Sequence, residues 1–118
     1  MSQENRQSER YQEIGKVTSA EICSLPGILD DISATGCKIH YAFPVTVDME
    51  TEYELRLSPL HNSDEAPLVL KCLPQWINQI DDNTYIGFKV LYSPDANRLN
   101  EFITYLQDIS KDQIPDIL

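Results

Sequence analysis

The chain lacks the long apolar segments of membrane and exported proteins. No run of 18 apolar residues occurs, so no membrane-spanning helix is expected. The first six residues do not place an apolar stretch behind a basic start, so they do not resemble a signal peptide. The three cysteines, Cys23, Cys37 and Cys72, form no C-x-x-C motif, which favours reduced thiols over disulfides or zinc. We therefore expect a cytoplasmic protein without membrane insertion.

Basic residues are also scarce. Nine Lys and Arg stand against nineteen Asp and Glu, which gives a net charge of −10. Such a chain is a poor binder of nucleic acid or of an anionic membrane, and we expect neither partner. A small anion is not excluded in the same way, because charges are screened over about 8 Å at physiological salt. Nearby arginines can outweigh distant carboxylates.

Catalytic and metal-binding motifs are absent as well. The sequence has no Walker loop and no G-x-G-x-x-G, and Ser33 has no evident histidine partner. Asp30 and Asp31 are adjacent, so on a regular strand they would face opposite ways and could not act as a carboxylate pair. His40 and His61 have no Cys, Asp or Glu at metal-ligand spacing. We expect neither an enzyme nor a metal or cofactor site.

What the chain does contain is alternation of apolar and polar residues. Four segments alternate with a period of two, which is typical of half-buried strands: 37–41, 53–57, 68–72 with a continuation toward Trp76, and 86–90. Turn-forming residues separate the segments. About six antiparallel strands in a mainly β chain point to a small barrel, with Leu55, Ile86 and Phe88 in its core.

The period changes near the end of the chain. Leu99, Phe102, Ile103 and Leu106 follow the i, i+3, i+4, i+7 spacing of one helical stripe. The sequence predicts a C-terminal helix with Ser93 as N-cap, and the helix should pack on an open end of the barrel. At 118 residues the chain fits one domain. We expect that domain at 14–111, a polar, flexible N-terminal arm at 1–13 and a tail at 112–118. Trp76 is expected to pack in the core or at its rim.

Two short motifs carry the functional prediction. Arg6 and Arg10 form R-x-x-x-R, and after twenty residues Asp31, Ser33 and Gly36 form D-x-S-x-x-G. Two guanidinium groups four residues apart can bind phosphate or a guanine edge. An acidic side chain, a hydroxyl and a glycine at a strand turn can close the other side of such a site.

This motif pair, followed by a strand-rich body and a terminal helix, resembles the PilZ domain, the bacterial receptor for cyclic di-GMP. The resemblance implies a six-stranded antiparallel β-barrel with a C-terminal helix. It also implies roles for the motif residues. The two arginines would contact phosphates and the guanine O6/N7 edge, and Asp31 would accept hydrogen bonds from guanine N–H groups. Ser33 would bond a phosphate or hold the loop, and Gly36 would permit close backbone approach.

The sequence thus favours a bacterial cyclic di-GMP receptor. Because the chain shows no output domain, we expect it to act in trans through an unidentified protein partner. One alternative is a PilZ-fold adaptor that binds a protein partner without nucleotide. Another is a barrel that binds a different small anion with the same arginines.

Overall fold

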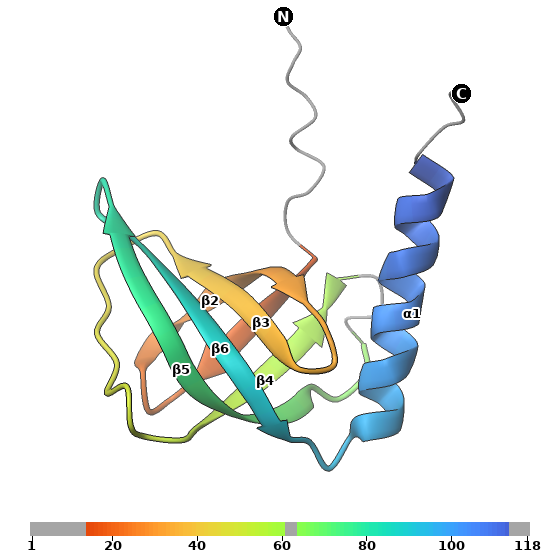
Figure 1. Cartoon of the computed structure of the whole chain (residues 1–118), viewed down its shortest axis with the longest axis horizontal. Helices are drawn as coiled ribbons and strands as arrows, with labels where there is room; N and C mark the ends of the chain where they lie inside the picture. The colour runs from red at the N-terminus through yellow and green to blue at the C-terminus, as the bar shows by residue number, and fades with distance from the viewer. Residues whose placement is uncertain (1–13, 61–63, 114–118) are drawn as a thin grey trace, which may run out of the picture.

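The structure, a computed structural model, describes residues 14–60 and 64–113. Six strands precede one helix, as Figure 1 shows. The strands are β1 (Gly15–Ser19), β2 (Cys23–Ile32), β3 (Gly36–Tyr41), β4 (Tyr53–Pro59), β5 (Leu68–Ile80) and β6 (Asn83–Tyr92), and the helix is α1 (Ala96–Gln113).

The strands close into a barrel in the order β1-β2-β3-β6-β5-β4. Every neighbouring pair is antiparallel. The predicted fold, a mainly β protein built on a six-stranded antiparallel barrel with a C-terminal helix, is confirmed. Short connections let β2 fold back on β1, β3 on β2 and β6 on β5. The longer connection between β3 and β4 instead joins two strands that are not neighbours in the barrel.

The barrel interior is filled by the alternating apolar residues. Leu55 and Ile86 are fully buried and Phe88 is almost so, as predicted. In β4 every second residue from Tyr53 to Pro59 is buried, and the intervening residues face outward. The alternation therefore separates a core face from an outer face along β1, β3 and β4, and a ligand can bind on the outer face.

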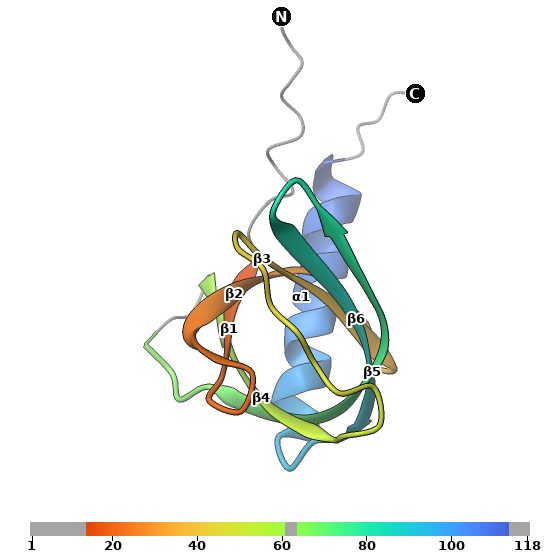
Figure 2. The same cartoon turned by 90° about the vertical axis from the view of Figure 1, so that its left-hand side faces the viewer.

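Helix α1 covers one end of the barrel. In the end-on view of Figure 2 it lies behind the barrel opening. Leu99 and Phe102 are buried in the core, and Ile103 and Leu106 pack against it, which confirms the predicted stripe. Within the described residues, no helix is both long and apolar enough to cross a bilayer.

The start of the helix differs from the prediction. The first helical residue is Ala96, and the Asp95 carbonyl accepts a hydrogen bond from Leu99 N at 2.9 Å, so Asp95 holds the cap position assigned to Ser93. Ser93 Oγ donates to Val69 O at 2.6 Å, and Asp95 Oδ2 accepts from Val69 N at 2.9 Å. Ser93 Oγ also accepts a hydrogen bond from Asp95 N at 3.0 Å, so Ser93 keeps part of the local role predicted for it. Both side chains in addition attach the segment before the helix to β5, a long-range role that local capping rules do not include.

The β5–β6 hairpin extends past the rest of the barrel wall, as Figures 1 and 2 show. Its turn contains Asp81 and Asp82, both with positive φ (52° and 71°). Two successive residues in the left-handed region produce the turn twist that suits a tight hairpin, and aspartate tolerates that region better than most residues. The inner side of the hairpin contacts the connection between β3 and β4, where Thr84 Oγ1 donates to Phe43 O at 2.9 Å and accepts from Val45 N at 3.0 Å.

Candidate functional site

The D-x-S-x-x-G motif lies on a single exposed hairpin. Asp31 is near the end of β2, Ser33 is in the turn, and Gly36 begins β3. The structure therefore brings these three predicted site residues together. Arg6 and Arg10 lie outside the described residues, as do the predicted arm at 1–13 and most of the predicted tail.

Ser33 organises the hairpin turn. Its Oγ accepts hydrogen bonds from the backbone N–H groups of Thr35 at 3.3 Å and of Gly36 at 3.2 Å. Its own N–H donates to the Gly36 carbonyl at 2.8 Å. A serine that bonds amides two and three residues ahead fixes the turn locally. Of the two roles considered for Ser33, this geometry supports the one that holds the loop.

Gly36 permits a close approach between two strands. No glycine in the described residues has positive φ, so Gly36 is not required for a left-handed turn. A Cβ at this position would lie 3.0 Å from the Phe88 carbonyl oxygen of β6. The glycine therefore lets β3 pack tightly against β6 at the hairpin.

Asp31 is exposed and has no hydrogen-bond or ion-pair partner among the described residues. It stands opposite Lys38 in the β2–β3 register, and Gly36 stands opposite Lys89 in the β3–β6 register. The two lysines are also exposed, so cationic side chains flank the hairpin even though the chain as a whole is acidic. An exposed, unpaired carboxylate beside lysines is free to receive hydrogen bonds from a ligand.

Asp30 corrects one prediction. The β2–β3 register shifts between Leu29 and Asp31, so Asp30 sits in a β-bulge. Leu29 and Ile32 are both buried, and the two aspartates between them lie away from the core, not on opposite sides of the strand. A bulge adds one residue to a strand and resets its alternation, and adjacent-residue arguments from sequence cannot include that effect.

The bulge pairs Asp30 with His40. The two carboxylate oxygens lie 2.9 and 2.8 Å from His40 Nδ1, and both side chains are about one-quarter exposed. His40 also stacks on Tyr85 of β6, with ring centroids 5.3 Å apart and planes 29° apart. These contacts fix the outer surface of three adjacent strands beside Asp31.

Aromatic surface continues across β6 toward β5. Lys38 Nζ lies 5.8 Å from the Tyr85 ring centroid, a distance typical of a cation–π contact. Trp76 covers Gly87, since a Cβ at Gly87 would fall 2.2 Å from its Nε1. The indole is still 43% exposed, so Trp76 is a rim residue with one face available to solvent.

The sequence did not identify Asp30, His40, Lys38 and Tyr85 as one cluster. The period-two pattern does predict that Lys38 and His40 lie on the outer face. It does not predict which residues of the neighbouring strands lie beside them, because the register depends on the bulge at Asp30 and on long-range pairing.

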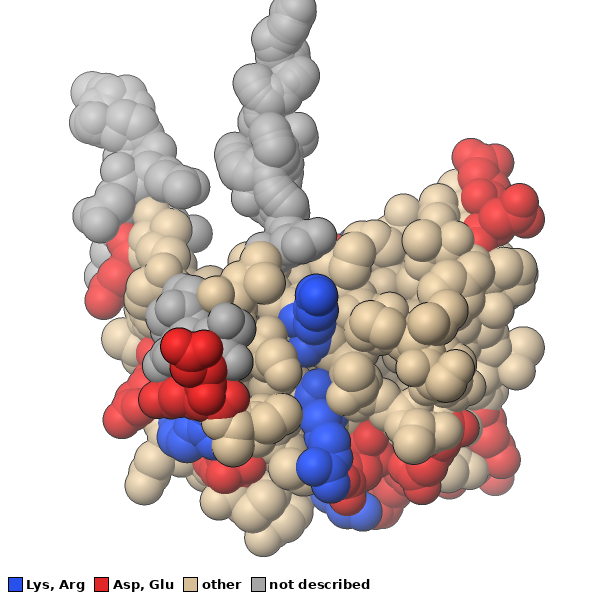
Figure 3. Space-filling view, turned by 180° about the vertical axis from the view of Figure 1, so that it is seen from behind, with Lys and Arg blue, Asp and Glu red and all other residues tan. Residues whose placement is uncertain are grey.

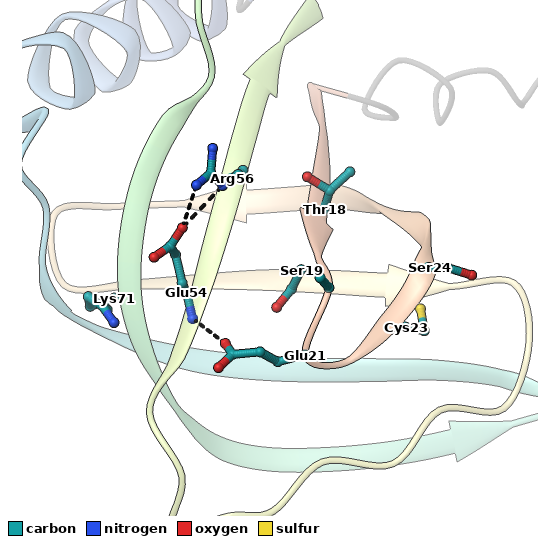
Figure 4. Close-up of a pocket in the computed structure, with 9 residues that line it drawn as sticks. Thr18, Ser19, Glu21, Cys23, Ser24, Glu54, Arg56 and Lys71 are labelled. Carbon is teal, nitrogen blue, oxygen red and sulfur yellow. Dashed lines mark hydrogen bonds and ion pairs between the residues drawn. The ribbon is translucent and has the colours of Figure 1, made fainter.

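A separate pocket of about 560 Å³ lies at the opposite end of β2. Figure 4 shows its polar lining, in which Arg56 and Glu54 form an ion pair at 2.9 Å and Glu21 Oε1 accepts from Glu54 N at 3.1 Å. Lys71 and three hydroxyl residues complete much of the wall. Seen from behind, Lys and Arg form a narrow vertical line and one smaller separate group among tan and red surface, so this face has no broad basic patch (Figure 3).

Two ionisable groups inside the barrel, Tyr41 and Cys72, have raised pKa values. Burial raises the pKa of the Tyr41 hydroxyl, and the nearby Cys23 and Cys37 add to the effect. A hydrogen bond with Cys37, followed by burial, raises the pKa of the Cys72 thiol. Cys37 and Cys72 are buried free thiols, so they behave as small core residues.

The family model described as PilZ domain matches residues 4–110, a span that includes Arg6, Arg10 and the whole hairpin. The chain belongs to the PilZ domain family. PilZ domains as a family bind cyclic di-GMP and are typically non-catalytic binding or adaptor domains. No curated protein and no solved structure matches the chain significantly.

Proposed function

We propose that this PilZ domain binds cyclic di-GMP on the outer face of β2, β3 and β6, around the hairpin that carries Asp31. The observation that carries the proposal is the state of Asp31: its carboxylate is exposed and has no partner in the described part of the chain. Guanine N–H groups are suitable donors to such a carboxylate. Arg6 and Arg10, which precede β1, supply the guanidinium groups for the phosphates and the guanine O6/N7 edge.

Local charge supports an anionic ligand despite the net charge of −10. Lys38 and Lys89 flank the hairpin on β3 and β6. The nearest other acidic group, Asp30, is already paired with His40. The exposed face of Trp76 offers a stacking surface at the β5 side of the same face, and base–aromatic stacking contributes about 1–3 kcal/mol per base.

We further propose that binding acts in trans. Residues 1–13 bring the arginines to the hairpin, and the contact between this segment and the barrel creates the surface that a protein partner recognises. Amide hydrogen exchange of residues 4–13 tests this step: exchange should slow when cyclic di-GMP is bound. Unchanged exchange alongside measurable binding would refute the coupling and leave the binding site intact.

Calorimetric titration tests the binding itself, with GTP and cyclic AMP as ligand controls. Cyclic di-GMP should bind with a Kd on the order of micromolar. Arg6→Ala, Arg10→Ala and Asp31→Ala should each weaken binding by about 30- to 1000-fold, because each removes one partner of a charged hydrogen bond. Arg56→Ala and Asp108→Ala are matched controls, since they remove the same charges at exposed positions away from the hairpin.

Two results would overturn the proposal. If wild-type protein binds no cyclic di-GMP at 100 μM, roughly 100 times the expected Kd, the chain is better described as a PilZ-fold adaptor. If cyclic di-GMP binds but Arg6→Ala, Arg10→Ala and Asp31→Ala all bind it as tightly as wild type, the ligand occupies another surface.

A further inference from the structure

The β5–β6 hairpin leaves one strand edge unpaired. β4 pairs with β5 only from Leu68 to Cys72, whereas β6 pairs with β5 as far as Ile80. Among the described residues no strand and no backbone hydrogen bond occupies the other edge of β5 from Leu73 to Ile80. The backbone N–H and C=O groups of this edge thus have no backbone partner in the described part of the chain, on a hairpin that projects from the barrel (Figures 1 and 2).

The edge has little of the usual protection against strand pairing. Natural edge strands carry charged residues, proline or bulges that prevent another strand from adding. Here the segment from Cys72 to Ile80 contains no Asp, Glu, Lys or Arg, although the chain is 24% charged. Pro74 and the register shift between Pro74 and Trp76 interrupt the first part of the edge. The five residues from Trp76 to Ile80 come after the proline and the register shift, and they pair with β6 without further interruption.

The side chains of these five residues alternate between two faces. Ile77 stands opposite buried Ile86, and Gln79 stands opposite buried Thr84, so both lie on the strand face that turns toward the core, although Gln79 itself is exposed near the hairpin tip. Trp76, Asn78 and Ile80 therefore face outward. Trp76 is 43% exposed and Ile80 is 52% exposed, which leaves two large apolar groups on one short strand.

We propose that this edge pairs with the same edge of a second copy of the chain, antiparallel and centred on Asn78. A twofold axis at Asn78 places Trp76 of one copy opposite Ile80 of the other, twice, and places Ile77 opposite Gln79. Every opposed pair then shares a face, because the offset between partners is an even number of residues. The sequence is thus complementary to itself in this register, and the two most exposed apolar side chains of the hairpin cover each other.

Electrostatics also favours a second copy at this edge. Two chains of net charge −10 repel each other, and they can approach most closely where neither carries charge. In the proposed register the tip residue Asp82 comes opposite Pro74 of the second copy. In that second copy, Leu73 is next to Pro74 and pairs with Lys89 of its own β6. A lysine therefore lies on the strand behind the one that Asp82 meets.

The dimer should be weak and strengthened by salt. Five paired residues a side bury less than the roughly 1,600 Å² of a standard stable interface, so we expect a Kd on the order of 100 μM. Salt should tighten the dimer because it screens the repulsion between the two acidic bodies. The dimer and a base stacked on Trp76 would use the same exposed face of the indole, so the dimer is tested without cyclic di-GMP.

Sedimentation equilibrium from 10 μM to 1 mM protein tests the proposal, on either side of the expected Kd. Wild-type protein should move from monomer toward twice the monomer mass. Asn78→Lys should remain monomeric throughout, because it places two ammonium groups opposite each other at the axis. Gln107→Lys adds the same charge on α1 and should dimerise like wild type. Trp76 is the only tryptophan, so its emission should shift to the blue with concentration in wild type and not in Asn78→Lys.

Oxidative cross-linking fixes the register. Asn78→Cys should form a disulfide-linked dimer readily, since opposed residues of antiparallel strands have Cβ atoms about 5 Å apart. Gln107→Cys should not. A wild-type protein that stays monomeric at 1 mM overturns the proposal. So does a dimer that Asn78→Lys leaves unchanged or that Asn78→Cys fails to cross-link, because such a dimer uses another surface.

Discussion

Replacing Tyr41 with phenylalanine should stabilise the fold. The Tyr41 side chain is 1% exposed, and its hydroxyl has no hydrogen-bond partner among the described residues. A buried, unsatisfied polar group costs about 1–3 kcal/mol of folding free energy. Removing one oxygen leaves a cavity that costs on the order of 0.3 kcal/mol. The free energy of unfolding should therefore rise by about 1–2 kcal/mol, and Tm by about 3–8 °C.

Tyr53 provides the matched control. It is also buried, but its hydroxyl accepts a hydrogen bond from Asp48 N at 2.8 Å. Tyr53→Phe removes the same atom and leaves the Asp48 amide without that partner, so it should lower the free energy of unfolding by about 0.5–1.5 kcal/mol. The same chemical change should thus have opposite signs at two positions of one barrel. Urea unfolding followed by circular dichroism measures both.

Alkaline pH gives a second, independent measure of Tyr41. Because burial raises its pKa in the folded protein, Tyr41 stays neutral while an unfolded tyrosine ionises near pH 10. The folded state then binds more protons, so the stability of wild type falls as pH rises above about 10. The raised pKa of Cys72 also lowers stability as the pH rises above about 8.5. Wild type and Tyr41→Phe share this effect, so it cancels from the difference between them. The advantage of Tyr41→Phe should therefore grow above pH 10, by up to about 1.4 kcal/mol per pH unit.

A Tyr41→Phe protein that is less stable than wild type would show that the hydroxyl has a hydrogen-bond partner in solution. A stability difference that stays constant from pH 8 to pH 11 would show that Tyr41 ionises as an exposed tyrosine does, and that it is not in the core.

Three further predictions concern the core and the hairpin. Phe88→Ala should cost about 3–5 kcal/mol of stability by urea unfolding, because the ring is 3% exposed; a loss below 1 kcal/mol would contradict its core position. Ser33→Ala should lower the Tm by a few degrees, since about 1 kcal/mol is typical of a lost side-chain hydrogen bond, and it should weaken cyclic di-GMP binding less than Asp31→Ala does. The reverse order of affinities would assign the ligand contact to Ser33. Gly87→Ala should displace the Trp76 indole and shift its emission to the red at 5 μM, well below the expected dimer Kd; unchanged emission would contradict the contact between the two residues.

The main features of the barrel could be predicted because they depend on local pattern. Alternation in 53–57 and 86–90 fixes which side chains are buried whatever the strand order, and the stripe from Leu99 to Leu106 does the same for α1. Turn residues such as Asp81 and Asp82 mark where the chain reverses. These signals locate four of the six strands and the helix without any knowledge of which strand pairs with which, whereas β1 and β2 were not located by alternation.

What could not be predicted depends on register. The bulge at Asp30 exists only because β2 and β3 pair with an offset of one residue, and the contact between Asp30 and His40 follows from it. The position of the helix cap depends on Val69, which is 26 residues before Asp95. The free β5 edge follows from β4 ending its pairing at Cys72. Each of these is set by long-range packing, which competes with local preference and in these cases overrides it.

The three hairpin residues differ in what explains their presence. Ser33 fixes the turn, and Gly36 lets β3 approach β6, so the fold alone accounts for both. Asp31 has no such role: its carboxylate pairs with nothing in the described residues, lies beside Asp30, and adds to a net charge that is already −10. A PilZ barrel can therefore lose Asp31 and still fold, whereas loss of Ser33 or Gly36 disturbs the hairpin itself. Asp31 is consequently the residue that separates ligand binding from fold, and its variant is the one whose stability and affinity should respond independently.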